Sequence, residues 1–351
     1  ANLEATLAVF GELDRIKPDK IVSLGDLAGY NANPNDVIDI VRQRQIPSVM
    51  GNHDAAACGL EDPWFFRAAA KKAVEWQYDV LREGWIEYAL SDLIAFRAGK
   101  IKTPTTRQMM VAPELQQFVD VSMASSITGS LMPGYTDRNR DYGLLIHGLF
   151  GCNNEWQYMV AVTNGDGGDT TRNVLKPLTS DNLAYSARLN WAFLQPIGYM
   201  EGAVRQQTCR WYGEAGLWGH YYSDRLDGGG SGLFPLVALY DRLASGFDLA
   251  LGYGGFSLTG EFTYLDFSGS DVFFDETWML LLLQAGYHFP GTAREVAARW
   301  SAYERSIETP IGDFEPHTNE FAVAVNYFLN GHGNKIQLDA TWLSAEGDGP
   351  Q

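Results

Sequence analysis

From about Leu93 onward, apolar residues alternate with polar or small ones, and this period of two constrains the fold more than any other feature. In residues 247–254, Phe, two Leu and Tyr share one face, and Asp, Ala and two Gly share the other. Residues 256–264 repeat the pattern, with Ser, Thr and Glu on the polar face. Such alternation predicts β-strands whose two faces meet different surroundings.

Similar segments recur through the rest of the chain. The clearest of the others are residues 185–193, 296–302, 321–329 and 336–342. We count about eleven strands in all, of the length that tilted strands need to cross a bilayer. After residue 84 lie 31 of the 37 glycines, which fits short strands joined by many turns.

The strands of a soluble β-sandwich also alternate, so alternation alone does not distinguish a sandwich from a barrel. The side chains on the two faces are the better criterion. The polar face carries Arg, Asp and Glu beside Gly and Ala, as in a wet lumen rather than a packed layer. Connections alternate between short and long polar ones. Aromatic residues recur at strand ends, where membrane interfaces place them: Trp156, Tyr185, Phe193, Tyr221, Tyr264, Phe289, Tyr327 and Trp342. These features favour a transmembrane β-barrel over the sandwich.

Charge and hydropathy exclude two other classes. The net charge of −17 argues against non-specific nucleic-acid binding, which depends on neutralising phosphates. The longest apolar run, residues 278–283, is far shorter than the ~18–20 residues of a membrane-spanning helix.

Residues 1–84 follow a different pattern, typical of an α/β fold. Helical periodicity covers residues 2–16, 35–44 and 62–81, and short apolar strands cover 21–24 and 46–50. Each strand ends in polar residues, Asp26 after the first and Asn52-His53-Asp54 after the second. Because ligands gather beyond the carboxyl ends of such strands, we expect these groups to face one crevice. Carboxylate, amide and imidazole groups suit Mn, Fe or Zn.

Through Gly25-Asp26 and Gly51-Asn52-His53-Asp54, residues 1–82 resemble the calcineurin-like metallophosphoesterases. The resemblance implies an enzyme with two divalent metals (Mn, Fe or Zn) that hydrolyses phosphoesters with a metal-bound hydroxide. It implies that Asp26 bridges the metals, that Asn52 is a metal ligand, and that His53 contacts the phosphate.

Two departures from that family change the expectation. Its Asp-x-His motif would precede Asn2, and its Gly-His-x-His motif has only Gly219-His220-Tyr221-Tyr222 as a counterpart. We therefore expect residues 1–84 to be a truncated α/β fragment without phosphatase activity. Asp26, Asn52 and His53 would then be vestigial.

Residues 85–351 resemble the phosphate-selective porin O and P family. The likeness is carried by the order and spacing of residues 96–104, 115–123, 140–148, 285–287, 326–332 and 335–339. It implies an outer-membrane barrel of about sixteen strands, without a cofactor and usually trimeric, that passes small solutes and often anions. The predicted fold is therefore mainly β: a partial transmembrane antiparallel barrel, with about 11 of about 16 strands, behind the α/β fragment.

Selectivity in such a pore would come from basic side chains at a constriction. We expect the segment between Lys100 and Arg140 to fold into the lumen. The pore-lining basic residues would be Lys100, Lys102, Arg107, Arg138, Arg140, Arg188 and Arg299. Alternatively, these are rim charges paired with nearby carboxylates. Residues 85–351 have a net charge of −13, so a general diffusion porin fits equally well.

The two halves imply different compartments, an outer membrane and a cytoplasmic-type fold, and no signal peptide starts the chain at Ala1. Our hypothesis is a reading frame that joins fragments of two genes. An open barrel in lipid leaves edge N–H and C=O groups unpaired, so we expect no closed pore from this chain alone, and a homotrimer only for a complete barrel. Three functions stay open: a porin, a phosphoesterase, and a soluble β-rich binding domain.

Overall fold

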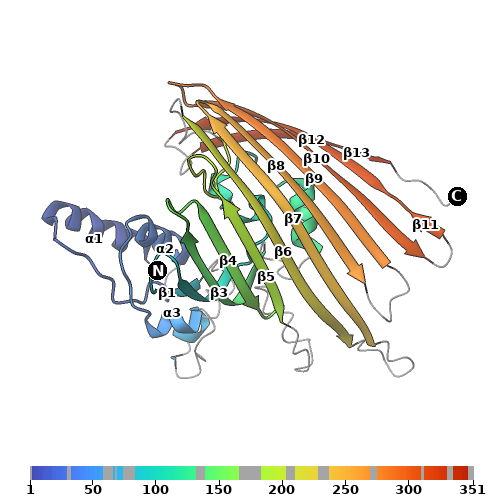
Figure 1. The fold of residues 1–351 in the computed structure, drawn as a ribbon. Coiled ribbons are helices and arrows are strands. Elements are labelled where there is room, and N and C mark those ends of the chain that lie inside the picture. Colours follow the sequence, from blue (N-terminus) through green and yellow to red (C-terminus); the bar gives the residue numbers. More distant parts are fainter. Residues whose placement is uncertain are drawn as a thin grey trace.

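The computed structural model describes residues 2–29, 33–57, 66–67, 69–73, 84–131, 139–165, 183–202, 210–227, 237–268, 275–309, 312–329 and 335–346. A large, strongly curved antiparallel sheet dominates the molecule, and the N-terminal helices lie beside its β1 edge (Figure 1). Within these ranges, no helix has the length and apolar character that crossing a membrane requires.

The N-terminal segment contains three helices, α1 (Leu3–Ile16), α2 (Pro34–Gln43) and α3 (Asn52–Ala57). Asn2 caps α1 by accepting the Ala5 N–H at 3.0 Å, which satisfies one of the open donors of the first turn. Arg44, at the end of α2, donates to Asp14 of α1 at 2.7 Å, and this hydrogen bond lowers the pKa of the Asp14 carboxyl. The first two predicted helices are thereby confirmed.

The two predicted parallel strands are reduced to one parallel bridge, between Ser23 and Ser48. Their relative direction is as predicted, but the predicted extent of strand over 21–24 and 46–50 was wrong. An isolated pair of strands is only marginally stable, and no third strand joins this one within the described residues. Of the predicted third helix, residues 69–73 are helical and much of the rest lies outside the described residues.

The main sheet has 13 strands, and its main path runs in chain order from β1 to β13. Every pairing is antiparallel, and short β11 pairs only with β10. This confirms the predicted mainly β, antiparallel architecture. The strands are β1 (Gly84–Ala89), β2 (Ala95–Lys102), β3 (Arg140–Phe150), β4 (Trp156–Thr163), β5 (Ala184–Trp191), β6 (Trp211–Asp227), β7 (Val237–Tyr253), β8 (Phe256–Ser268), β9 (Asp275–His288), β10 (Arg294–Thr309), β11 (Gly312–Phe314), β12 (His317–Phe328) and β13 (Lys335–Glu346).

Connections differ between the two ends of the sheet. At one end β3 and β4 are joined through residues 151–155, and β7 and β8 through Gly254-Gly255 alone. Gly254 has φ +59°, a conformation that suits the first position of a two-residue hairpin turn. The opposite end carries the longest connection, residues 103–139 between β2 and β3.

The described residues of that connection fold back against the concave face of the sheet (Figure 1). Its described part, residues 103–131, is called the inserted segment below; it contains α5 (Arg107–Met110), a 3-10 helix (Pro113–Leu115) and α6 (Met123–Leu131). Ala124 of α6 packs with Trp218, Leu265 and Leu280 of the sheet in a buried apolar cluster. The prediction that the segment between Lys100 and Arg140 folds inward is thereby confirmed for residues 103–131, and residues 132–138 lie outside the described residues.

Candidate functional site

The two faces of the sheet have opposite polarity, in the reverse sense to a soluble protein. On β5, Tyr185, Leu189 and Trp191 are 49%, 37% and 43% exposed. Arg188 and Asn190, which alternate with them, are buried on the side of the inserted segment. Other strands repeat this, with exposed Leu217, Tyr221, Leu243, Phe247, Leu249, Leu281, Leu283, Phe321, Val323 and Val325, and buried His220, Asp248, Glu261, Gln284, Glu295, Arg299, Ser301, Glu320 and Asn326.

Aromatic side chains form a row at the end of the sheet with the short turns. Trp156 stacks on Trp191 with ring centroids 5.5 Å apart, and Trp211 lies 4.7 Å from Tyr253. On β6, exposed Tyr221 lies on the same face as Trp211 and ten residues away from it. In barrels whose strands tilt by ~40°, ten residues at ~3.3 Å each span about 25 Å along the barrel axis. This matches the height of the apolar band between two aromatic girdles.

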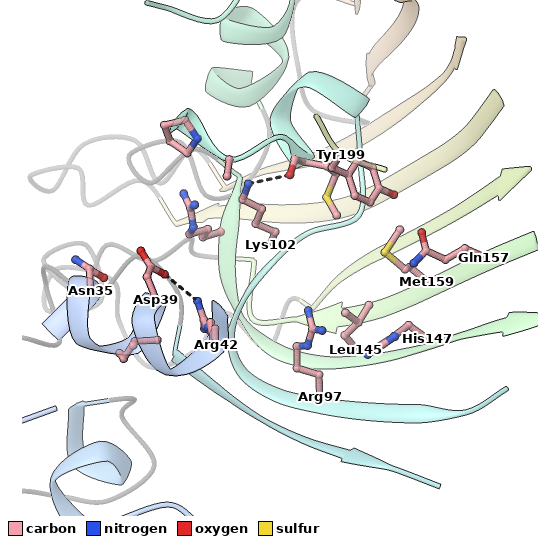
Figure 2. Close-up of a pocket in the computed structure, with 15 residues that line it drawn as sticks. Asn35, Asp39, Arg42, Arg97, Lys102, Leu145, His147, Gln157, Met159 and Tyr199 are labelled. Carbon is pink, nitrogen blue, oxygen red and sulfur yellow. Dashed lines mark hydrogen bonds and ion pairs between the residues drawn. The ribbon is translucent and has the colours of Figure 1, made fainter. Parts of the chain in front are cut away.

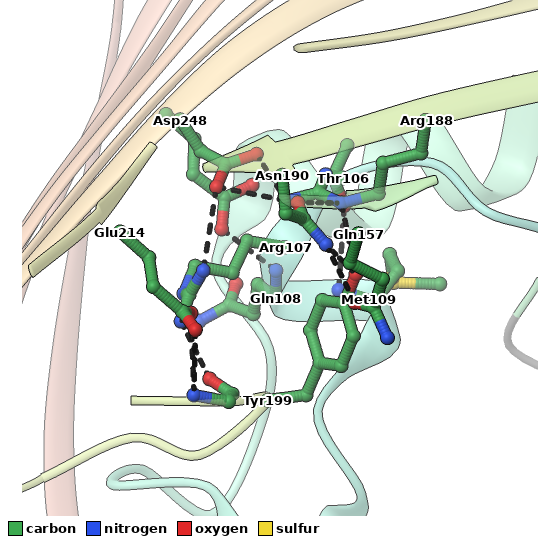
Figure 3. A network of polar contacts seen from close by, with 12 residues as sticks. Thr106, Arg107, Gln108, Met109, Gln157, Arg188, Asn190, Tyr199, Glu214 and Asp248 are labelled. Carbon is green, nitrogen blue, oxygen red and sulfur yellow. Dashed lines mark hydrogen bonds and ion pairs between the residues drawn. The ribbon is translucent and has the colours of Figure 1, made fainter. Parts of the chain in front are cut away.

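Buried ion pairs tie the inserted segment to the wall of the sheet (Figure 3). Arg107 of α5 lies 2.7 Å from the Glu214 carboxylate of β6 and 3.6 Å from the Asp248 carboxylate of β7. Arg188 of β5 lies 2.7 Å from the same Asp248 and donates to the Thr105 carbonyl at 2.5 Å. Asp248 therefore serves two guanidinium groups, one from the segment and one from the wall.

Neighbouring contacts continue this network around the concave face. The Gln108 N–H donates to Glu261 of β8 at 2.7 Å, and the Gln108 amide donates to Glu201 at 2.8 Å. Gln284 of β9 donates to the second Glu201 oxygen at 2.9 Å. A buried carboxylate is stable in such a position because several donors converge on it.

A second ion pair holds the other end of the inserted segment. Arg299 of β10 donates to Glu320 of β12 at 2.6 Å and to the Asp120 carbonyl at 2.8 Å. Its guanidinium carbon lies 4.4 Å from the centroid of the Phe118 ring. Met123 N–H in turn donates to Glu320 at 2.6 Å. The inserted segment is thus bound to strands on both sides of the concave face.

The seven predicted pore-lining residues fall into three groups. Arg107, Arg188 and Arg299 are ion-paired with carboxylates. Pairing with carboxylates is what the alternative to a pore-lining role predicted. Lys100 and Lys102 end β2, and Arg140 begins β3. Arg138 lies outside the described residues. Whether any of the seven selects solutes stays a prediction.

The acidic partners were missed as site residues by the sequence analysis. Glu214, Asp248 and Glu320 each occupy an inward position of an alternating strand, the same parity that selected Arg188 and Arg299. The alternation could therefore have identified each carboxylate as an inward-facing residue. It does not predict which arginine that carboxylate pairs with.

The N-terminal polar residues do come together. The backbone N–H of His53 donates to the Asp26 carboxylate at 3.2 Å, and the His53 ring stacks on Phe66 at 4.6 Å between centroids. Asp54 accepts the Ala28 N–H at 2.7 Å and the Gly51 N–H at 3.0 Å, which links the two loops. Asp26, with φ +55°, and Asn52 thus stand at the end of the single parallel bridge.

This donor set does not fit a two-metal centre. Across the part of the chain that the structure describes, no three His, Cys, Asp or Glu side chains are grouped so that they could hold a metal ion. Asp26 and Asn52 supply one carboxylate and one amide, fewer than two ions require. His220 lies in β6, where its Nδ1 is 2.8 Å from the Ser186 hydroxyl of β5. The side chains that the structure describes are thus too few to hold the two metals of a phosphoesterase.

Contact between the two loops depends on the absence of a side chain at Gly51. A Cβ at this position would overlap the Asp26 carboxylate and lie 2.6 Å from the Asp26 backbone nitrogen. We expect Gly51→Ala to destabilise residues 3–57 by roughly 1–3 kcal/mol, measured by hydrogen exchange of the full chain. Gly11→Ala is the control: nothing lies within 4 Å, so a mid-helix alanine should stabilise α1 by ~0.5–1 kcal/mol. Equal protection in both variants would contradict the argument.

Comparisons with known proteins match the two parts differently. The sequence model of the calcineurin-like phosphoesterase family matches residues 1–117, through β1 and β2. The uncharacterized protein MJ0912 of Methanocaldococcus jannaschii is 37% identical over 148 residues, 42% of this chain and 56% of that protein. The chain thus spans about half the length of this relative.

Among solved structures, the in-vitro folded OmpT, an outer membrane protein of Vibrio cholerae, superposes with a TM-score of 0.43 and 8% identity. The superposition covers 75% of this chain and 77% of that one. None of these matches shows the predicted likeness to porins O and P, which stays a prediction. The N-terminal third of the chain is similar to the calcineurin-like phosphoesterases.

Proposed function

We propose that the sheet from β1 to β13 is part of the wall of an outer-membrane pore that passes small solutes, including anions. The observation that carries the proposal is the reversed polarity of the sheet, with large apolar side chains exposed outside and charged side chains buried inside. Lipid stabilises an apolar outer face of this kind, and a water-filled lumen stabilises a charged inner face.

Free energy supports lipid as the partner of the outer face. Full burial of a Leu or Phe side chain contributes about 1.5–3 kcal/mol. The exposed outer residues are roughly half accessible, so transferring each into lipid contributes ~1 kcal/mol. A contiguous face of this kind is far larger than the scattered apolar residues of soluble surfaces.

The two edge strands of the sheet, β1 and β13, need partners if the proposed pore is to be stable in lipid. In lipid, the outward N–H and C=O groups of β1 and β13 must find partners, because each unsatisfied group costs several kcal/mol. In the described residues the strand order runs from β1 to β13 without closing. The pore therefore includes further strands, either of this protein or of a second copy.

Planar-bilayer recording tests the proposal. We expect the full chain, added from detergent, to give discrete conductance steps through pores that several copies close together, and to migrate on gels in a heat-modifiable way. A steeper than linear rise of step frequency with protein concentration would indicate closure by copies. A chain that is monodisperse without detergent and never conducts would contradict the pore and favour a soluble β-rich domain.

The second candidate is a metal-dependent phosphoesterase carried by residues 1–82. The family match over residues 1–117 and the approach of His53 to Asp26 support it. The small donor set weighs against it. Hydrolysis of bis(p-nitrophenyl) phosphate with Mn²⁺, lost in His53→Ala, is the result that would favour it.

A further inference from the structure

A cavity of about 420 Å³ lies between helix α2 and the concave face of strands β2 to β4 (Figure 2). Four cationic side chains line it: Arg42 of α2, Arg97 and Lys102 of β2, and Arg140 of β3. Asp39 is the one acidic side chain among the lining residues that the structure describes. In a chain of net charge −17, this is a local concentration of positive charge.

Two of these cations meet on one aromatic ring. The guanidinium carbons of Arg97 and Arg42 lie 3.9 Å and 5.0 Å from the centroid of the Trp85 ring. Arg97 also lies 2.7 Å from Glu87, a residue outside the cavity lining. The Arg42–Asp39 pair is long, 3.8 Å, and both side chains are more than a third exposed, so it neutralises Arg42 weakly.

The other two cations extend from strands β2 and β3, and the inserted segment holds the first of them. The Lys102 ammonium donates to the carbonyls of Met110 and Val111 at 3.0 Å and 3.1 Å. These two hydrogen bonds fix the position of the ammonium at the cavity wall. Arg140 is only 3% exposed. Charges restrained in this way are arranged before a ligand arrives, which lowers the cost of binding.

We propose that this cavity binds a small multivalent oxyanion, shared between α2 and the concave face of the sheet. Guanidinium groups present planar pairs of donors that match oxyanions, and an ammonium adds a point charge. The exposed apolar residues are on the opposite face of the sheet, so the anion comes from solution and not from a lipid headgroup. The inference rests on contacts between α2 and the sheet, and it does not depend on whether the sheet conducts.

Calorimetric titration of the full chain in detergent micelles with inorganic pyrophosphate, at constant ionic strength, tests the site. We expect one saturable site, stronger for pyrophosphate than for chloride. Arg42→Gln should weaken the affinity by about tenfold, because one charge-assisted donor pair is lost. Lys102→Gln should weaken it as well.

Arg15→Gln is the matched control. Arg15 also lies on an N-terminal helix and pairs with an acid three residues away, Glu12, but it is outside the cavity lining. The pyrophosphate affinity of Arg15→Gln should equal that of the parent chain. Equal affinities for Arg42→Gln and Arg15→Gln, or no saturable heat at all, would overturn the proposal. If Arg42→Gln alters the circular dichroism, Arg42→Lys is measured in its place. A pyrophosphate affinity of Arg42→Lys equal to that of the parent chain would then count against the site.

Discussion

Replacing Phe247 by arginine should destabilise the membrane-inserted state by about 2–4 kcal/mol. This is the cost of an arginine near the bilayer midplane on the lipid face of a barrel. Phe247 is 57% exposed on β7, between Leu243 and Tyr253, which share its face. Its ring lies 5.4 Å from that of Phe262 on β8, which belongs to the same outer surface.

The expected loss of stability distinguishes a lipid-facing surface of a pore from the surface of a soluble domain. On the surface of a soluble sandwich, the same exposed substitution would change stability by no more than ~0.5 kcal/mol. The measurement is a urea titration of the chain folded into lipid vesicles, followed by heat-modifiable migration. Phe247→Leu is the control and should keep most of the parent stability, since the side chain stays apolar. An arginine variant as stable as this control would remove the argument for a lipid-facing surface.

The strands were predictable because each obeys a local rule. Alternation fixes which residues share a face, so Leu249 and Asp248 fall on opposite sides of β7 without knowledge of the partners. The in-folded segment was predictable for a similar reason, since residues 103–139 are long and lie between two strands. Pairing was not predictable: Arg107 and Asp248 are far apart in sequence, and only the packing of the inserted segment on the curved sheet brings them together.

The N-terminal segment shows the opposite case. Its motifs predicted that Asp26 and His53 approach each other, and they do. The strands before these motifs were predicted from apolar runs, but an isolated pair of strands is only marginally stable, and here only Ser23 and Ser48 pair. Nor could the sequence show that Arg42 of α2 would line a cavity with Arg97 of β2. Both outcomes depend on tertiary context.

Replacing Asp248 by asparagine should give the largest loss of stability from a single inward position. The carboxylate is fully buried between Arg107 and Arg188, whose side chains are 2% and 0% exposed. Removing the shared anion leaves two guanidinium groups buried with less compensation, and breaking a buried pair costs about 3–5 kcal/mol. Denaturant unfolding of the full chain in micelles, followed by tryptophan fluorescence, measures the change.

Two further variants make this test specific to the buried pair. Asp241→Asn is the control on the same strand: its carboxylate accepts the Tyr221 hydroxyl at 3.1 Å at an exposed site, so its loss should stay below ~0.5 kcal/mol. Arg188→Met combined with Asp248→Leu removes both charges of one pair and leaves Arg107 with Glu214. The double variant should be more stable than Asp248→Asn, because an uncompensated buried charge costs more than a lost pair. A double variant no more stable than Asp248→Asn would contradict the argument that the unpaired charge of Arg188 causes the loss.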